Sequence, residues 1–70
     1  MADQLPKRFG ARVRSLRKRK KLSQERLALE SGLDRSYMGQ VERGECNISL
    51  LNVGKIAKGL KVRLDVLFNL

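Results

Sequence analysis

Residues 22–44 predict two short helices separated by a tight turn at Gly32, and this segment constrains the fold more than any other. Ser23 fits the N-cap of the first helix, because its hydroxyl can accept a hydrogen bond from a free backbone N–H. Gly32 fits its C-cap, because glycine adopts the left-handed conformation at little steric cost. Asp34 is expected to cap the second helix, which runs to about Glu42. Two helices joined so closely must cross at a steep angle.

Apolar residues recur at helical spacing in the rest of the chain and predict three further helices. The first covers about residues 7–20. Another begins after Ser49 and ends at Gly59, and a short last helix covers about residues 64–69. The residues expected to face inward are Phe9, Val13, Leu16, Leu27, Ala28, Leu33, Met38, Val41, Leu51, Ile56, Ala57, Leu60, Leu64, Leu67 and Phe68. No stretch alternates as a strand would, so we expect one all-α domain of five helices over residues 1–70.

The chain has 70 residues, one cysteine and no histidine, which limits how it can be stabilised. A disulfide within the monomer is excluded, and a zinc site lacks its four nitrogen and sulfur ligands. Small domains without such links often gain stability by association, so a homodimer is expected. There is no paired nucleophile and base and no phosphate loop, so we expect neither an enzyme nor a cofactor. No signal peptide or membrane-spanning run is present, which favours the cytoplasm and no membrane partner.

The formal net charge of +9 is placed unevenly along the chain. Residues 1–21 hold nine Lys and Arg against one acid, whereas residues 22–46 have a net charge of −2 and residues 47–70 a net charge of +3. So local an excess of one sign predicts a polyanionic partner. Nucleic acid is favoured, with an acidic membrane surface second.

The turn segment and its neighbours resemble the Cro/CI-type helix-turn-helix family, also called the Xre family, of phage repressors and bacterial regulators. The resemblance rests on Leu22-Ser23-Gln24, Leu27-Ala28, Gly32-Leu33, Val41-Glu42-Arg43-Gly44, Ile56-Ala57-Lys58-Gly59-Leu60 and Leu67-Phe68. Gly32–Tyr37 and Asn47–Asn52 are similar to stretches of the restriction–modification controller proteins in that family. The resemblance implies a compact, lambda-repressor-like domain with its helix-turn-helix at about residues 23–43. It also implies a sequence-specific regulator of transcription that binds double-stranded DNA.

The helix after Asp34 would be the recognition helix, whose N-terminal end meets base edges in the major groove. Arg35 can bond guanine O6 and N7 through both arms of its guanidinium, and Gln40 can pair with adenine in the same bidentate way. Ser36 is short and adaptable, and Tyr37 can contact a phosphate or a thymine methyl. By resemblance, the base-reading positions fall on Arg35, Ser36 and Gln40. The alternative for each is a solvated polar side chain.

Other positions are expected to hold the DNA backbone or the fold. The expected backbone contacts are Gln24, Arg43, Asn47, Arg14 and Lys18. The resemblance also implies a structural ion pair between Arg17 and Glu42. Controller proteins often carry Arg where this chain has Cys46, so one basic contact is absent or supplied by Arg43. Gly39 either allows close approach to a base or phosphate or is a tolerated helix defect.

Apolar residues near the C-terminus remain after the inward positions are filled. Leu50, Val66 and Leu70 are the best candidates for a patch shared across a two-fold axis, and Val53 and Val62 are further candidates. The alternative is that some of these residues complete a small core. A dimer would read a two-fold symmetric operator with half-sites about 10 base pairs apart.

Two further functions stay open beside an operator-binding regulator. One is a small antitoxin-like or other protein-interaction module with autoregulatory DNA binding. The other is a basic protein that binds RNA or a membrane surface. The RNA- or membrane-binding function is disfavoured, because binding RNA or a membrane surface does not require Ala28, Gly32 and Val41 at their observed spacing. For a regulator, RNA polymerase is a further expected partner when the operator lies beside a promoter.

Overall fold

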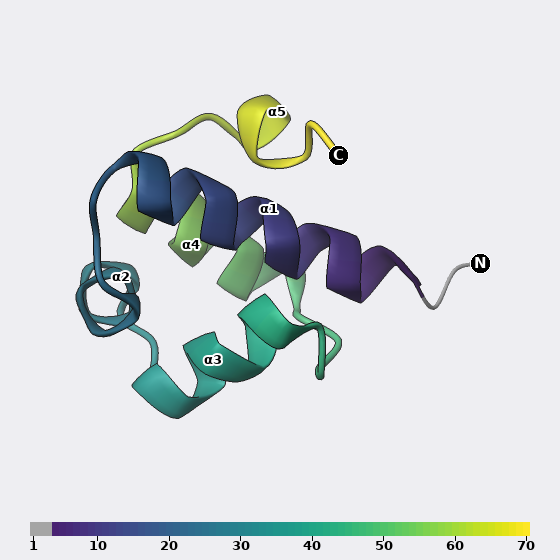
Figure 1. Ribbon diagram of the computed structural model, residues 1–70, viewed down its shortest axis with the longest axis horizontal. Helices are drawn as coiled ribbons and strands as arrows, with labels where there is room; N and C mark the ends of the chain where they lie inside the picture. The colour runs from purple at the N-terminus through teal and green to yellow at the C-terminus, as the bar shows by residue number, and fades with distance from the viewer. Residues whose placement is uncertain (1–3) are drawn as a thin grey trace.

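The computed structural model describes residues 4–70, which form five α-helices and no strand. The helices are α1 (Leu5–Arg19), α2 (Gln24–Ser31), α3 (Arg35–Arg43), α4 (Leu50–Leu60) and α5 (Leu64–Leu67). Figure 1 shows α1 along the middle, with α3 and α5 on opposite sides of it. Helix α2 is viewed end-on and lies near the C-terminal end of α1. Packing is heaviest between α2 and α4 and between α1 and α3. The all-α, five-helix prediction is confirmed.

Local capping sets the ends of the central helices as the sequence predicts. Ser23, Asp34 and Ser49 each accept a hydrogen bond from a backbone N–H in the first turn of α2, α3 and α4, respectively. Gly32 closes α2 with φ +68° and Gly44 closes α3 with φ +72°, both left-handed conformations that favour glycine. The turn between α2 and α3 therefore has the predicted form.

One hydrophobic core lies between the helices. Its buried residues are Phe9, Val13, Leu16, Leu27, Ala28, Met38, Val41, Val53, Ile56, Ala57, Leu60 and Leu67. The inward predictions for Leu51 and Leu64 are wrong, since these side chains are 72% and 54% exposed. Val53 replaces Leu51 in the core, because Val53 shares one helical stripe with the other buried residues of α4 and Leu51 lies about half a turn away. Phe68 is 44% exposed, although its ring packs 5.4 Å from that of Phe9 between centroids.

The prediction that α4 ends at Gly59 is also wrong. The helix continues to Leu60, and Lys61 is its C-cap with φ +58°. Gly59 instead lies buried where α4 meets α2, and a Cβ on it would overlap the Ser31 hydroxyl. Tertiary packing therefore explains this glycine. The ends of the outer helices differ by a few residues from those predicted, since α1 begins at Leu5 and α5 ends at Leu67.

A second glycine, not singled out from the sequence, sets the distance between α1 and α3. A Cβ on Gly10 would overlap the backbone carbonyl oxygens of Val41 and Glu42. These atoms belong to the last turn of α3 and cannot move aside as a flexible side chain would. Only glycine at this position lets α1 approach the C-terminal end of α3 so closely.

The same two helices are joined by a partly buried ion pair. The Arg17 guanidinium donates from Nε to Glu42 Oε2 at 2.7 Å and from Nη2 to Oε1 at 3.1 Å. Gln24 Nε2 donates to Glu42 Oε1 at 3.1 Å, and Arg17 Nη1 donates to the carbonyl oxygen of Leu22 at 2.9 Å. The side chain of Glu42 is only 3% exposed and that of Arg17 is 12% exposed. The expected Arg17–Glu42 pair is thus present and ties together α1, α2 and α3.

We expect opposite effects from adding a methyl group at Gly10 and at Gly54, both inside helices. Gly10→Ala should lower the free energy of unfolding by about 1–3 kcal/mol, because the new Cβ overlaps backbone. Gly54→Ala should raise it by about 0.5–1 kcal/mol, because a Cβ there meets nothing within 4 Å and alanine favours helix. Urea denaturation at one protein concentration measures both. Equal effects would contradict the close contact at Gly10.

Removal of the buried carboxylate should destabilise the fold strongly. Glu42→Gln leaves the Arg17 guanidinium without its counter-ion, and we expect the free energy of unfolding to fall by about 3 kcal/mol. Glu25→Gln, an exposed change of the same charge on α2, should change it by less than about 0.5 kcal/mol. Thermal and urea unfolding provide the measurement. Similar losses for the two variants would show that the buried pair does not support the fold.

Candidate nucleic-acid interface

The N-terminal end of α3 is presented at the surface by the turn that precedes it. Leu33 N–H donates to the carbonyl oxygen of Ala28 at 2.9 Å, which closes the turn after Gly32. The Asp34 carboxylate then accepts from the backbone N–H of Ser36 at 2.9 Å. The first residues of α3 are therefore held in a defined conformation while their side chains face outward.

Three of the four predicted base-reading side chains are free to meet a ligand. Arg35, Ser36 and Gln40 are exposed, and none of their side chains makes a hydrogen bond or ion pair within residues 4–70. Tyr37 differs, because it packs against the core and its hydroxyl oxygen accepts a hydrogen bond from Asn52 Nδ2 at 3.1 Å. The tyrosine O–H remains able to donate, so α4 fixes the position of a donor at the edge of this surface.

The predicted backbone contacts occupy the surroundings of α3 in different ways. Arg14, Lys18 and Asn47 are exposed. Gln24, at the start of α2, is half-buried and hydrogen-bonded to Glu42, so it braces the end of α3. Arg43 is paired with Glu45 at 3.0 Å, and the hydrogen bond and negative charge of Glu45 raise the pKa of Arg43. Arg43 is thus charged, but a phosphate would have to compete with the exposed Glu45 carboxylate for its guanidinium.

Gly39 has a role that the sequence left open. It lies buried in α3, and a Cβ there would come 3.0 Å from Arg43 Nη1 and 3.4 Å from Gln24 Oε1. The missing side chain makes room for two polar side chains from different elements, which converge over the middle of α3. Close approach of DNA and a tolerated helix defect both stay predictions for Gly39, because Arg43 is exposed and the end of its side chain can move aside.

An apolar surface lies at the other end of α4 from its C-cap. Leu50 is 86% exposed, Val66 37% and Leu70 39%, and Phe68 is exposed beside them in the sequence. A groove of about 200 Å³ is lined by Leu5, Pro6, Phe9, Val41, Cys46, Asn47, Ile48, Leu50, Val53 and Phe68. The predicted dimer residues Leu50, Val66 and Leu70 are thus all at the surface, but only Leu50 lines the groove. Of the two further candidates, Val53 is buried and Val62 is partly buried against the core, as the alternative of a completed core predicts.

Arginines of α1 hold the C-terminal segment in place. Arg12 donates from Nε and Nη2 to the carbonyl oxygen of Val66, at 3.1 and 2.9 Å. Arg8 donates from Nη2 to the carbonyl oxygen of Leu70 at 3.3 Å. Two arginines of α1 therefore point away from α3 and stabilise the fold. The sequence alone did not distinguish these two arginines from the other cations of α1.

Other kinds of site find no support in the residues described. No group of three or more His, Cys, Asp or Glu in residues 4–70 is arranged to hold a metal ion. None of the five helices is both long and apolar enough to cross a membrane.

Comparison with known proteins places this geometry in a family. Residues 13–67 match the family HTH_3, described as helix-turn-helix. The chain is 46% identical over 63 residues to the control protein C.MunI of a Mycoplasma species, covering 89% of this chain and 85% of that protein. It is 48% identical over 56 residues to the control protein C.BamHI of Bacillus amyloliquefaciens, covering 79% of this chain and 69% of that protein.

A solved structure shows the same arrangement of helices. The restriction–modification controller protein C.AhdI from Aeromonas hydrophila superposes with a TM-score of 0.89 at 53% identity, covering 97% of this chain and 100% of that one. The resemblance seen in the turn segment is thereby confirmed over nearly the whole chain. The chain belongs to the HTH_3 helix-turn-helix family, together with these controller proteins.

Proposed function

We propose that this chain regulates transcription as a restriction–modification controller, binding a two-fold symmetric operator as a homodimer with α3 in the major groove. The observation that carries the proposal is the exposed N-terminal end of α3. The side chains of Arg35, Ser36 and Gln40 make no hydrogen bond or ion pair within residues 4–70, while the opposite end of the helix is anchored by the buried Arg17–Glu42 pair. A rigid helix with unoccupied hydrogen-bonding groups at its tip suits the reading of base edges.

Each base-reading residue then has a distinct part. The Arg35 guanidinium reaches guanine O6 and N7, and the Gln40 amide offers both a donor and an acceptor to adenine. Ser36 adapts to either a base or a phosphate. Tyr37, whose hydroxyl oxygen is engaged by Asn52, donates its proton to a phosphate oxygen or borders a thymine methyl.

Affinity comes from groups that hold the phosphates on either side of α3. Arg14 and Lys18 are exposed and share the helical stripe of α1 that carries Gly10 and Arg17, the two residues that contact α3, and the exposed Asn47 follows α3. Gln24 lies at the start of α2, where free backbone N–H groups also favour an anion. Arg43 joins them if a phosphate displaces Glu45, because an arginine side chain is charged with either partner.

The dimer is proposed to form through the apolar groove and its rim. An exposed leucine such as Leu50, 86% accessible beside a groove with a mostly apolar lining, is disfavoured in water. A two-fold contact is self-complementary, so one patch serves both protomers. Whether the bound dimer activates or represses transcription depends on where its operator lies relative to a promoter. RNA polymerase bound at that promoter is then its neighbouring partner, in the bacterial cytoplasm.

Selection of bound sites from random double-stranded DNA, at fixed salt, tests the proposal directly. We expect a two-fold symmetric consensus with half-sites about 10 base pairs apart. No enrichment of any sequence would contradict the function. An asymmetric consensus would contradict the dimer.

Arg35→Ala should weaken binding to the best selected site by about 1–3 kcal/mol and relax preference at one base, because it removes a bidentate contact. Lys18→Gln is the matched loss of one positive charge. It should weaken binding to all sequences alike and reduce the salt dependence by about 0.9 in log–log slope. Fluorescence anisotropy on matched and mismatched duplexes measures both effects. Unchanged sequence preference in Arg35→Ala would show that α3 does not read this base.

Leu50→Glu should dissociate the dimer without unfolding the chain, because Leu50 is on the groove and already exposed. We expect the dimer dissociation constant to rise at least about tenfold, the effect of 1.4 kcal/mol. Leu29→Glu, at a 69% exposed leucine of α2 that does not line the groove, is the control and should leave it unchanged. Sedimentation velocity gives the oligomeric state and circular dichroism the fold. Equal behaviour of the two variants would rule out the groove as the interface.

A further inference from the structure

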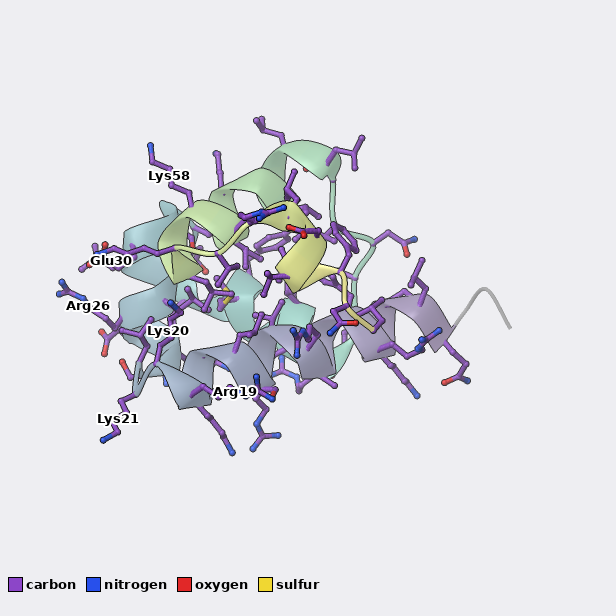
Figure 2. The ribbon with its side chains drawn as sticks, turned by 90° about the horizontal axis from the view of Figure 1, so that it is seen from above. Arg19, Lys20, Lys21, Arg26, Glu30 and Lys58 are labelled. Carbon is purple, nitrogen blue, oxygen red and sulfur yellow. The ribbon has the colours of Figure 1, made fainter. Side chains whose placement is uncertain are left out.

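Positive charges gather at the end of the bundle where α1 and α4 finish. Figure 2 shows Lys20, Lys21, Arg26 and Lys58 at this end, and Lys61 follows Lys58 at the C-cap of α4. We call these five residues the basic end. The ion pairs within residues 4–70 include only one of them, Arg26, which is bonded to Glu30 at 2.6 Å. The other four are lysines without an acidic partner among the described residues.

The basic end has a shape as well as a charge. A hollow of about 270 Å³ lies between the α1–α2 connection and the end of α4. It is lined by Lys20, Leu22, Arg26, Glu30, Gly59, Leu60 and Lys61. Two lysines without an acidic partner among the described residues, Lys20 and Lys61, therefore border one concave surface together with the Arg26–Glu30 pair. Such a surface suits an anion with several negative oxygens rather than a single small ion.

Two of these lysines occupy backbone positions that favour glycine. Lys21 has φ +57° and Lys61 has φ +58°, and they are the only non-glycine residues with positive φ in residues 4–70. In the same protein, glycine takes the left-handed positions at Gly32 and Gly44. A side chain in this conformation is strained, and such strain is commonly retained where the side chain has a use. Both exceptions are lysines of the basic end.

The position of the basic end relative to the two proposed contacts suggests its ligand. Both α1 and α4 run from the apolar groove, at Leu5 and Leu50, to the basic end. In a dimer joined at the groove, the basic ends therefore point away from the two-fold axis. The start of α2, at Gln24, follows Lys21 by three residues and reaches α3 at its middle, near Gly39, and at its C-terminal end, through the bond to Glu42. If α3 lies on a half-site and the partner protomer lies at the groove, duplex beyond the half-site extends on the side of the basic end.

We propose that the basic end binds phosphates of the DNA that flanks each half-site, outside the base pairs read by α3. The inference rests on the proposed function, which places α3 on an operator and the partner protomer at the groove. It adds a second, sequence-independent contact that lengthens the DNA held by each protomer. Binding there requires only the phosphate backbone, so it contributes affinity and salt dependence but no base preference.

The test compares two duplexes that carry the selected consensus. One is trimmed to the consensus, and the other is extended by about ten base pairs, one helical turn, on each side. The wild-type full chain should bind the extended duplex several-fold more tightly. Its salt dependence should be steeper there by about 0.9 in log–log slope for each added phosphate contact. The wild-type half-site consensus should be the same with either flank.

Lys61→Gly is the decisive variant, because it removes the charge while relieving the left-handed backbone. If Lys61 acts only as a helix cap, this change leaves DNA binding unaltered and keeps or raises the unfolding midpoint. Under the proposal the midpoint behaves in the same way, but the preference for the extended duplex falls. The double variant Lys58→Gln/Lys61→Gly should abolish that preference and bind the trimmed duplex as the wild type does.

Lys55→Gln, one turn earlier on α4, is the charge-matched control and should retain the preference. Equal binding of both duplexes by the wild type would overturn the proposal. An equal loss in Lys55→Gln would overturn it too, because the effect would then be one of overall charge. Failure to bind even the trimmed duplex above a random one would instead contradict the proposed function itself.

Discussion

The contact between α1 and the end of α3 is the constraint on which the rest of the structure depends. Gly10 brings the two backbones together, and the Arg17–Glu42 pair joins them through two parallel hydrogen bonds. A planar guanidinium on a carboxylate fixes orientation as well as distance, which apolar packing alone does less sharply. Because Gln24 bonds the same carboxylate, the start of α2 is held in the same frame. The tip of α3 can then be exposed without becoming mobile.

The cations of the chain divide into groups with different tasks. Arg17 supports α3, while Arg8 and Arg12 hold the C-terminal segment through its carbonyl oxygens. Arg43 and Arg63 are paired with exposed acids near them in the sequence. Arg26 is likewise paired with Glu30, whereas the lysines, Arg14, Arg19 and Arg35 make no side-chain hydrogen bond or ion pair among the described contacts. A net charge of +9 therefore overstates the charge available to DNA, and the distribution of the unpaired cations matters more than their sum.

Much of the fold and the turn was predictable because local rules decide them. Ser23, Asp34 and Ser49 cap helices through bonds to residues two or three positions away, and Gly32 and Gly44 end them by a local backbone preference. Long-range contacts were predictable only where a family resemblance supplied them, as for Arg17 and Glu42. The resemblance likewise supplied Arg35, Ser36 and Gln40 as base readers. These three are exposed on α3, whereas Tyr37 is partly buried, and their contact with bases stays a prediction.

The errors arose where two helices meet, because sequence spacing does not tell which face of a short helix is covered. In α4 the covered stripe includes Val53 rather than Leu51, and in the single turn of α5 it includes Leu67, as predicted, but not Leu64. Gly59 looked like a helix end but is a point of contact with Ser31.

The sequence by itself determined five helices, their caps, the turn and the excess of positive charge, since each depends on neighbouring residues or composition. Only the tertiary structure decided what surrounds Gly10, Gly39 and Gly59. It also decided that Asn52 hydrogen-bonds the Tyr37 hydroxyl. Lys20, Arg26 and Lys61, finally, line one hollow only because of how the helices pack. Those features join residues far apart in the chain. Their distances follow from how whole helices pack, which no local pattern records.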